Sequence, residues 1–358
     1  MLRFAMRTAR AVACAALLAA CSRPSAPSGQ PVGQPAPVAA PAAASGAPVV
    51  RCGDGRPMTV RFYDVGQALA VLVELPDGRH VLVDAGDEPQ RPGCGDACAT
   101  ASAHLLSSLR RDLRGAPIDL LWLTHPHSDH IGGAPEVIAS LPVLAVADDG
   151  RDLAKAEVRR VRGAAEQRRI PVRAVEPGSS TPPLASSEAV KLTPVVPAAW
   201  PASCAHDANE CSIGLRVDYC RSSVLLVGDA EHEEEKMLEA GGPVTLLQVG
   251  HHGSETSTSP AFLARVRPAY AVISAGKPGE GVNRDYCHPR ALVVQRLTRV
   301  LGGAGSRSLI AFDGERCDRA TPADWVEVPA SDRLWATGRD GDVSLVTTGD
   351  GVFRRESQ

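Results

Sequence analysis

One short segment of the sequence constrains the fold more than any other. The apolar run 120–123 leads directly into three histidines and an aspartate within six residues: His125, His127, Asp129 and His130. Such polar side chains are costly to pack unless something binds them, and a metal ion is the obvious partner. In an extended segment residues i and i+2 share a side, so His125 and His127 are predicted to meet one ion, with Asp129 and His130 offset towards a second. The alternative is a solvated histidine cluster.

Two further apolar runs also end in residues that bind metals. Residues 224–227 lead into Asp229, and residues 246–249 lead into His251 and His252. Asp229 is predicted to bridge two ions through its two oxygens, and either His251 or His252 to complete the second site. Alone, a Gly-Asp pair is typical of a turn and a His-His pair of a solvated loop, but the three segments together favour a metal centre.

The first metal site lacks an obvious third ligand. His206 and Asn209 are both candidates, and either could instead belong to an ordinary loop. Gly132 and Gly133, which follow the histidine motif, are predicted to let the backbone turn sharply there.

The pattern of apolar residues predicts two series of strands, each accompanied by helices. Strands are expected at 58–63, 70–74, 80–83, 118–123, 143–147, 190–196, 213–219, 224–227, 244–249 and 270–274, and near residues 172, 309 and 343. Helices are expected at 101–113, 153–167, 260–266 and 291–301, and from residue 231. Two such halves predict an α+β fold, a four-layer αββα sandwich formed by residues 51–358.

The N-terminus is typical of an exported chain. Residues 1–20 combine a basic start with about 10 apolar residues, which predicts a signal peptide. Residues 18–21 resemble a lipobox, which predicts lipidation of Cys21, and Ser22 implies sorting to the outer membrane. The alternative is an ordinary secretory signal cut near Ala20. Residues 21–50 then form a Pro/Ala-rich tether, so the protein is expected to be lipid-anchored in the periplasm or at the cell surface.

Eight cysteines remain after Cys14 and Cys21 are set aside: Cys52, Cys94, Cys98, Cys204, Cys211, Cys220, Cys287 and Cys317. An even number in an exported chain predicts disulfides, although the sequence does not fix their pairing. Cys94 with Cys98 and Cys204 with Cys211 are the local pairs, and a metal role for Cys94 and Cys98 is the alternative.

The motifs His-x-His-x-Asp-His, Gly-Asp and His-His-Gly-Ser occur in an order that resembles the metallo-β-lactamase superfamily. The short sequence motifs around them resemble the soluble metallohydrolase domain of the ComEC family of DNA-uptake proteins. The matching words lie between residues 64 and 289: Asp64-Val65-Gly66-Gln67, Leu82-Val83-Asp84-Ala85-Gly86, Leu123 to Gly133, Asn209-x-x-Ser212, Val227-Gly228-Asp229-Ala230-Glu231, Val249 to Ser254, Ile273-Ser274-x-Gly276 and His288-Pro289. The family's membrane channel is not found here, so DNA transport is not implied.

The resemblance implies a metallo-β-lactamase fold and a hydrolase that uses a hydroxide bridging two divalent ions, zinc or manganese. A phosphodiesterase or nuclease is the leading function. The alternatives are a lactamase-like hydrolase of another ester or amide, and a surface lipoprotein that binds metal without catalysis. The substrate is expected to be a phosphodiester, another small molecule or a nucleic acid, with membrane contact through the lipid alone.

The resemblance also implies roles around the metals. Asp129 is expected to take part in catalysis, Asp84 to orient a ligand histidine through its second nitrogen, and His288 to donate to the leaving group or a substrate oxygen. The alternatives are a turn carboxylate for Asp84 and a structural histidine for His288. Asp64 and Gln67 are expected to hold loops or the substrate, and Ser254 to bond backbone.

The sequence departs from the family near the substrate. Ala68-Leu69 replaces Gly-Asp, Gln248 replaces a lysine, and Arg290 replaces the last histidine of Gly-His-Pro-His. The metal ligands are intact. A formal net charge of −3 and an aromatic content of 4% give no general attraction to nucleic acid, and the arginines of residues 159–169 are predicted to form a solvated face.

Overall fold

The computed structural model describes residues 49–303 and 307–356. The predicted signal peptide, the lipidated Cys21 and nearly all of the tether lie outside these residues. Within the described part, no helix combines the length and the apolar character needed to cross a membrane.

The larger of the two main sheets combines antiparallel and parallel strands. Its eight strands are, in spatial order, β16 (Arg354–Arg355), β15 (Val343–Thr347), β1 (Met58–Phe62), β2 (Val71–Glu74), β3 (His80–Val83), β4 (Leu120–Trp122), β5 (Val146–Asp148) and β6 (Val172–Ala174). Strands β1 to β3 form an antiparallel meander, and β3 to β6 run parallel. The parallel strands place the segments that follow them at one edge of the sheet.

The second sheet repeats this arrangement. Its six strands are, in spatial order, β14 (Leu334–Ala336), β11 (Tyr270–Ile273), β10 (Leu246–Gln248), β9 (Ser222–Leu226), β8 (Gly214–Tyr219) and β7 (Val190–Val195). Strands β7 to β9 are antiparallel, and β9, β10, β11 and β14 are parallel. A separate hairpin consists of β12 (Arg307–Phe312) and β13 (Trp325–Ala330).

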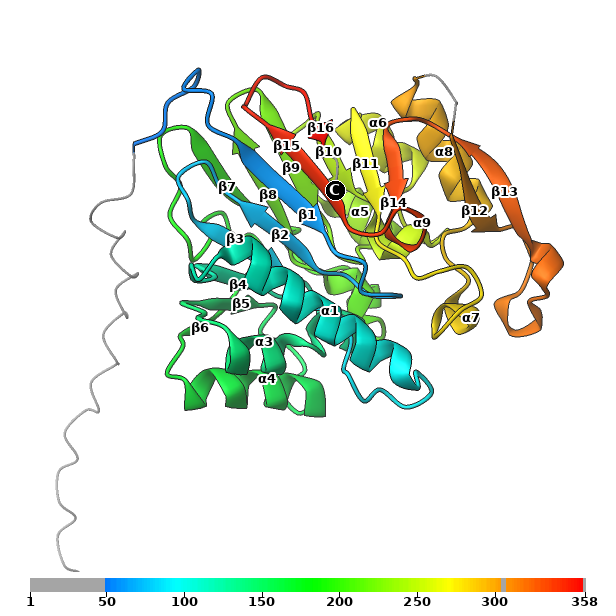
Figure 1. Ribbon diagram of the computed structural model, residues 1–358, viewed down its shortest axis with the longest axis horizontal. Helices are drawn as coiled ribbons and strands as arrows, with labels where there is room; N and C mark the ends of the chain where they lie inside the picture. Colours follow the sequence, from blue (N-terminus) through cyan, green and yellow to red (C-terminus); the bar gives the residue numbers. More distant parts are fainter. Residues whose placement is uncertain (1–48, 304–306, 357–358) are drawn as a thin grey trace, which may run out of the picture. The chain divides into compact units, whose positions relative to one another are not determined.

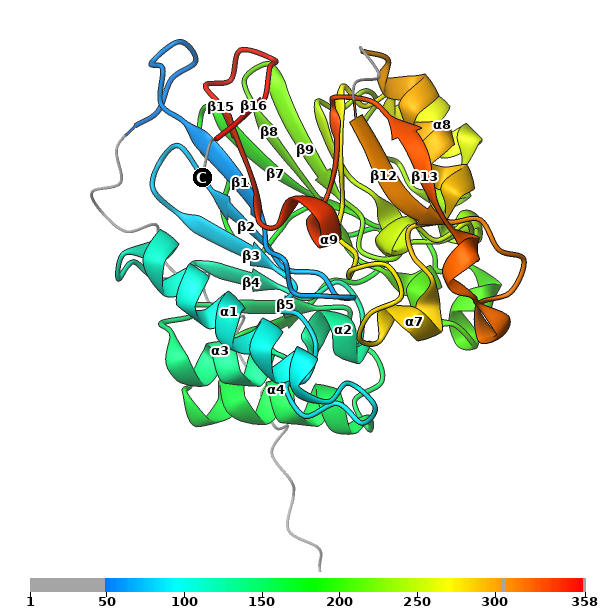
Figure 2. The same ribbon diagram turned by 45° about the vertical axis from the view of Figure 1, so that its right-hand side comes forward.

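Helices cover the outer faces of both sheets. The α-helices are α1 (Asp96–Leu113), α2 (Ser128–Ile131), α3 (Ala134–Ser140), α4 (Ala156–Gln167), α5 (His232–Met237), α6 (Pro260–Val266), α7 (Asn283–Tyr286), α8 (Ala291–Leu301) and α9 (Thr337–Asp340). Short 3₁₀ turns are η1 (Ala202–Ala205), η2 (Ala208–Cys211), η3 (Gly250–Gly253), η4 (Cys317–Arg319) and η5 (Pro322–Asp324). Figures 1 and 2 show α1, α3 and α4 on one side of the molecule and α6 and α8 on the other.

Alternation along the strands explains this layering. In β4, Leu120 and Trp122 belong to the core between the two sheets, whereas Leu121 packs in a second core against the helices. In β9, Val224 and Leu226 face the same central core and Leu225 faces a third. Strands that are apolar on both faces must be covered on both faces, and the result is the predicted four-layer αββα sandwich.

The structure forms four disulfides: Cys52–Cys220, Cys94–Cys98, Cys204–Cys211 and Cys287–Cys317. Both local pairs predicted from the sequence are therefore confirmed. Cys94 and Cys98 bond to each other, which leaves no free thiolate there for a metal.

Gly132 and Gly133 lie in the turn between α2 and α3, but the reason for glycine there differs from the prediction. Both have ordinary right-handed helical dihedral angles, so the backbone conformation itself does not require glycine. A Cβ on Gly132 would lie 2.3 Å from the nitrogen of Glu88, and one on Gly133 would lie 2.1 Å from the carbonyl oxygen of Ala85. Glycine is needed there because the backbone after β3 passes very close to the histidine motif.

Candidate metal centre

The predicted ligands follow parallel strands in both sheets. Asp84 follows β3, the histidine motif follows β4, Asp229 follows β9, and the His-His pair follows β10. Because β3 is parallel to β4 and β9 to β10, each pair of strands delivers its polar residues to one edge of its sheet. The two sets meet between the sheets.

Asp229 lies at the middle of this cluster and is 2% exposed. Its Oδ2 is 3.1 Å from His130 Nε2, 3.5 Å from His252 Nε2 and 3.8 Å from His251 Nε2. Asp129 approaches from the other sheet, with its Oδ2 3.5 Å from His252 Nε2. The structure therefore brings residues from three separated segments of the chain together.

Two sets of donor atoms have the spacing of a metal site. His125, His130 and Asp229 form one set, and Asp129, His130 and His252 form the other; in each set the donor atoms lie within 4.8 Å of one another. All five residues are buried. Imidazole nitrogens mixed with carboxylate oxygens suit zinc, manganese or iron.

Several donor atoms in this cluster are buried without a hydrogen bond. They are His130 Nε2, His252 Nε2 and Asp229 Oδ1, and Asn209 Oδ1 lies beside them. Buried polar atoms normally have partners, because an unpaired one costs about 1–3 kcal/mol. These unpaired atoms lie close to one another, and a divalent cation bound between them would supply the missing partner.

Asp84 holds His130 in the tautomer that a metal requires. Asp84 is completely buried, and its Oδ2 lies 2.7 Å from His130 Nδ1. A carboxylate only accepts, so Nδ1 carries a proton and Nε2 is the nitrogen left to bind a metal. Thr124 fixes the carboxylate, because its backbone N–H donates to Asp84 Oδ1 and its hydroxyl to Oδ2, both at 2.8 Å.

The backbone separates the roles of His251 and His252. Both residues have left-handed dihedral angles, with φ of 46° and 53°, a conformation that is uncommon for histidine and that turns successive rings in different directions. His252 Nδ1 donates to the carbonyl oxygen of Ser274 at 2.7 Å, so its Nε2 is bare towards both carboxylates. His251 also directs Nδ1 to an acceptor, Glu231 Oε1 at 2.8 Å, but it belongs to neither donor set. The donor sets therefore favour His252 as the ligand.

Three other predicted ligands differ in their placement. His127 is half-buried, with Nδ1 3.0 Å from His125 Nε2, but it belongs to neither donor set. Asn209 is buried, and its Nδ2 lies 3.5 Å from His251 Nε2. His206 is exposed and is in neither donor set, so the geometry favours Asn209 over His206 as the residue beside the centre.

Opposite charges within the cluster shift the pKa values of Asp229 and His130 in opposite directions. Burial alone would raise the pKa of Asp229, but the charges of His130, His252 and His251 hold it well below its usual value. Burial alone would lower the pKa of His130, but Asp229 and Asp84 raise it well above its usual value. Positive charge on the neighbouring imidazoles therefore keeps Asp229 ionised, and a bound divalent cation would take over that role and displace protons from the histidines.

The remaining predicted residues surround the centre. His288 is buried, which lowers its pKa well below the usual value, and its Nδ1 lies 3.1 Å from Gln67 Nε2. Asp64 lies farther out, in the wall of a cavity of about 620 Å³ that Gln67 also lines. Ser254 closes the turn after the His-His pair, since its N–H donates to the carbonyl oxygen of His251 at 2.8 Å.

Sequence reasoning gave no role to three residues that orient the ligands. They are Thr124, which holds Asp84; Glu231, which holds His251; and Ser274, whose carbonyl holds His252. Thr124 directly precedes the histidine motif and Glu231 follows Asp229 by two residues, so their positions offered a signal. The Ser274 contact offered none, because it uses a backbone carbonyl.

A family model described as the metallo-beta-lactamase superfamily matches residues 63–277, which is more than half of the chain. Among curated proteins, "Recombination protein 2" of Haemophilus influenzae is 32% identical over 237 residues, covering 66% of this chain and 26% of that protein. "ComE operon protein 3" of Bacillus subtilis is 29% identical, covering 67% and 30%. "Competence protein ComA" of Neisseria gonorrhoeae is 30% identical, covering 66% and 29%. The matched region therefore spans less than a third of each of these relatives.

Solved structures give weaker similarities. The diiron β-hydroxylase CmlA from Streptomyces venezuelae has a TM-score of 0.38 at 15% identity, covering 60% of this chain and 44% of that one. The metallo-beta-lactamase fold protein YhfI from Bacillus subtilis has a TM-score of 0.35 at 15% identity, covering 54% and 70%.

Proposed function

The chain belongs to the metallo-β-lactamase superfamily, and from that premise we propose that it is a metal-dependent phosphodiesterase. The observation that carries the proposal is the set of buried, unpaired donor atoms on His130, His252 and Asp229, which converge from both sheets. Hydrogen bonds to Nδ1 already direct Nε2 of both histidines into the cluster, so the centre is preorganised for cations.

Two divalent cations in this donor set would supply Lewis acidity and an activated water at neutral pH. The protein residues do the rest. Asp229 lies against histidines from both halves of the cluster, so it is the carboxylate placed to be shared. Asp84 and the Ser274 carbonyl keep two ligand rings from rotating.

A phosphodiester is favoured over a lactam because an aspartate at the position of Asp229, which is placed to be shared by two cations, resembles the phosphodiesterase and nuclease members of the superfamily more than its lactamases. The names of the relatives, a recombination protein and competence proteins, point to a nucleic-acid-related role and make a nuclease the narrower candidate.

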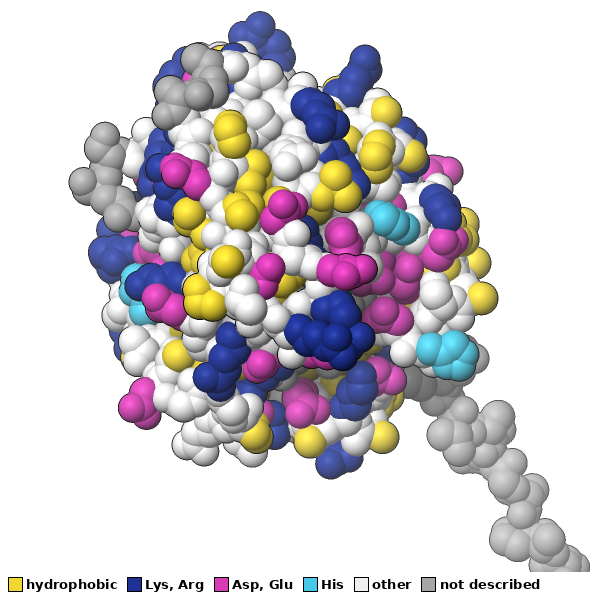
Figure 3. Space-filling model, turned by 90° about the vertical axis from the view of Figure 1, so that its right-hand side faces the viewer, with side chains coloured by type: hydrophobic (Ala, Val, Ile, Leu, Met, Phe, Trp, Pro, Cys, Tyr) yellow, Lys and Arg dark blue, Asp and Glu magenta, His cyan; other side chains and the backbone are white. Residues whose placement is uncertain are grey.

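The charge near the centre favours a small diester over a polynucleotide. The cavity that Gln67 lines has five carboxylates in its walls, Asp64, Asp87, Asp96, Glu280 and Asp342, of which Asp87 pairs with Arg91 and Asp342 with His104. Carboxylates repel the successive phosphates of a nucleic acid strand. On the face shown in Figure 3, acidic and basic side chains are interspersed rather than gathered into a basic stripe.

A panel of three substrates tests the proposal. Wild type loaded with Zn²⁺ or Mn²⁺ should hydrolyse bis(p-nitrophenyl) phosphate, and His252→Ala should lose at least about 100-fold. His206→Ala is the matched control, because it removes an exposed histidine outside both donor sets, and it should keep full activity. Hydrolysis of single-stranded DNA in preference to the small diester would establish a nuclease. Turnover of nitrocefin alone would overturn the proposal.

We also propose that the protein is exported and anchored by a lipid on Cys21. Its four disulfides support an oxidising compartment. The intact mass of the mature protein tests this proposal. A diacylated N-terminal Cys21 is expected, and an unmodified chain that starts at another residue would contradict it.

A further inference from the structure

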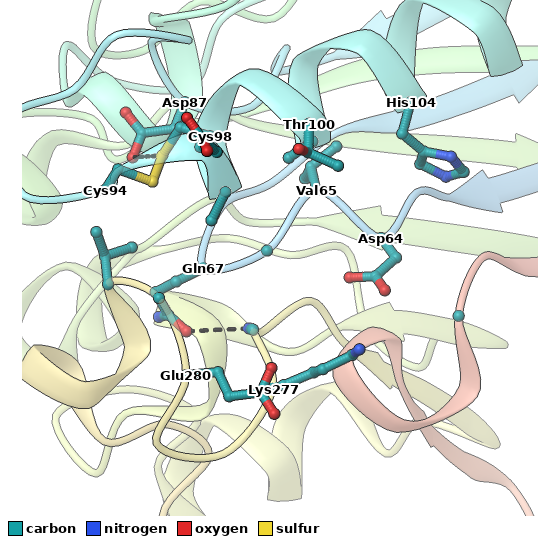
Figure 4. A pocket seen from close by; sticks show the side chains of 18 of the residues that line it. Asp64, Val65, Gln67, Asp87, Cys94, Cys98, Thr100, His104, Lys277 and Glu280 are labelled. Atoms are coloured by element: carbon teal, nitrogen blue, oxygen red, sulfur yellow. Dashed lines mark hydrogen bonds between the residues drawn. A yellow bond between two sulfur atoms is a disulfide. The ribbon is translucent and has the colours of Figure 1, made fainter.

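Gln67 lies between the cavity and the metal centre, and its side chain is only 3% exposed. Figure 4 shows the hydrogen bond that orients it, in which the N–H of Gly276 donates to Gln67 Oε1 at 3.2 Å. A backbone N–H can only donate, so the amide oxygen must lie on that side. The amide nitrogen therefore faces His288, with Nε2 3.1 Å from Nδ1.

This orientation decides where His288 carries its proton. The amide nitrogen of Gln67 can donate but cannot accept, so Nδ1 of His288 must be the bare acceptor nitrogen. A ring with a bare Nδ1 is neutral and has its proton on Nε2. The contact therefore selects one of the two neutral tautomers and excludes the imidazolium.

The backbone around His288 is fixed as well. Asn283, which is completely buried, accepts from the His288 N–H at 2.9 Å and donates to the His288 carbonyl oxygen at 2.7 Å. Asn283 also donates to the carbonyl oxygen of Gly276 at 2.8 Å. A Cβ on Gly276 would lie 2.9 Å from the nitrogen of Gln67, so glycine allows the two loops to meet.

His288 adjoins the metal centre without belonging to it. Its ring centroid is 5.5 Å from that of His251 and 6.4 Å from that of His252, and it is in neither donor set. Among the described residues, no hydrogen-bond partner is found for its Nε2. The Nε2–H group of His288 is therefore available to donate a hydrogen bond beside the place where a substrate would react.

We propose that Gln67 is a positioning residue that fixes His288 as the Nε2–H tautomer, so that the neutral ring donates a hydrogen bond to a phosphoryl oxygen that gains negative charge during hydrolysis. The inference rests on the proposed phosphodiesterase function and adds a role for two residues of this chain. No proton is transferred, since His288 acts as a hydrogen-bond donor that strengthens as charge develops.

The first test reads the proton directly, without activity. Long-range ¹H–¹⁵N spectra of the full-length protein should show His288 with Nδ1 bare and Nε2 protonated, both before and after loading with Zn²⁺. Gln67→Met removes the donor at nearly constant length, and His288 should then populate both tautomers. Gln295→Met, on the exposed side of α8, is the matched control and should leave the His288 signals unchanged.

The second test measures hydrolysis of bis(p-nitrophenyl) phosphate by the metal-loaded proteins. His288→Ala should lower kcat by about 10–100-fold with KM within about twofold, because the donor acts on charge that develops in the transition state. Gln67→Met should lower kcat several-fold, again with little change in KM. Metal content and thermal stability, measured in parallel, should match the wild type.

The possible outcomes separate the two proposals. A wild-type His288 with its proton on Nδ1, or one whose Nε2 binds the added Zn²⁺, overturns the inference. A Gln67→Met variant that loses activity only in proportion to metal content or stability overturns it too, since Gln67 would then be purely structural. Failure of the wild type to cleave the diester refutes the proposed function, and the spectra still decide whether Gln67 sets the proton on His288.

Discussion

Asp84→Asn is the substitution that tests the metal centre with the least disturbance of the fold. Asparagine has the same shape as aspartate and tolerates the left-handed backbone at this position, where φ is 57°. The Thr124 N–H, which donates to Asp84 Oδ1 at 2.8 Å, keeps an oxygen on that side in the variant. The new amide nitrogen must therefore face His130 Nδ1, which lies 2.7 Å from Oδ2 in the wild type.

The expected magnitude follows from the tautomer. In the wild type the carboxylate accepts from Nδ1, so Nε2 of His130, 3.1 Å from Asp229, is the nitrogen left for the metal. In the variant the amide donates to Nδ1, so the proton moves to Nε2, the atom that must bind the metal. Removal of such an orienting partner typically weakens metal binding by about 10–100-fold, which corresponds to roughly 1.4–2.7 kcal/mol.

A competition titration of Zn²⁺ against a chromophoric chelator measures this loss directly. The matched control is Asp77→Asn, which alters a buried aspartate paired with Arg79 outside the centre and should leave the affinity unchanged. An Asp84→Asn variant that folds normally and keeps wild-type affinity would refute the reasoning. So would an equal loss in both variants.

Three further predictions concern stability. Gly228→Ala should destabilise the fold by more than about 2 kcal/mol in urea unfolding, since φ is 58° and the new Cβ would lie 2.7 Å from Thr124 Cβ. The control is Gly163→Ala in α4, where the new Cβ meets nothing within 4 Å and should stabilise the fold by about 0.5–1 kcal/mol. Burial, together with the charge of Asp148, raises the pKa of Asp149 from 3.8 to about 6, so the folded state holds that proton more tightly and loses stability as pH rises from about 4 to above 6. Metal-free Asp149→Asn should therefore match the wild type at pH 4 and exceed it by roughly 2–3 kcal/mol at pH 8; equal stability at pH 8 would contradict this. Replacing the cysteines of Cys52–Cys220, which are 168 residues apart, should cost about 5 kcal/mol against about 2 kcal/mol for Cys94–Cys98, four residues apart, and denaturation curves that rank the pairs the other way would contradict the chain-entropy argument.

Most of the sandwich could be predicted from the sequence because its strands are short apolar runs between clear turn signals. Helix α1 begins at Asp96, five residues before the predicted start, and α4 begins at Ala156, three residues after it. Strand β14 was not predicted. The three residues of β14 are too few to show an alternation of apolar and polar side chains. The strand is defined instead by its parallel pairing with β11, more than 60 residues away in sequence.

The sequence predicts which segments form the candidate metal centre but not the details of its geometry. Residue types and order identified the three segments that meet at Asp229. The choice between His251 and His252 depends on two consecutive left-handed residues and on the Ser274 carbonyl, which no residue pattern records. Likewise, Gly132 and Gly133 read as turn residues in sequence, and only the close approach of another backbone segment shows why glycine is required.

Metal stoichiometry of the purified protein is the most direct test of the central claim. Mass spectrometry of the elements should find about two divalent ions per chain in the wild type and one or fewer in Asp229→Ala, because Asp229 contacts histidines from both donor sets. His206→Ala should retain two. A wild type without tightly bound divalent metal, or an Asp229→Ala variant that still binds two ions, would contradict the account.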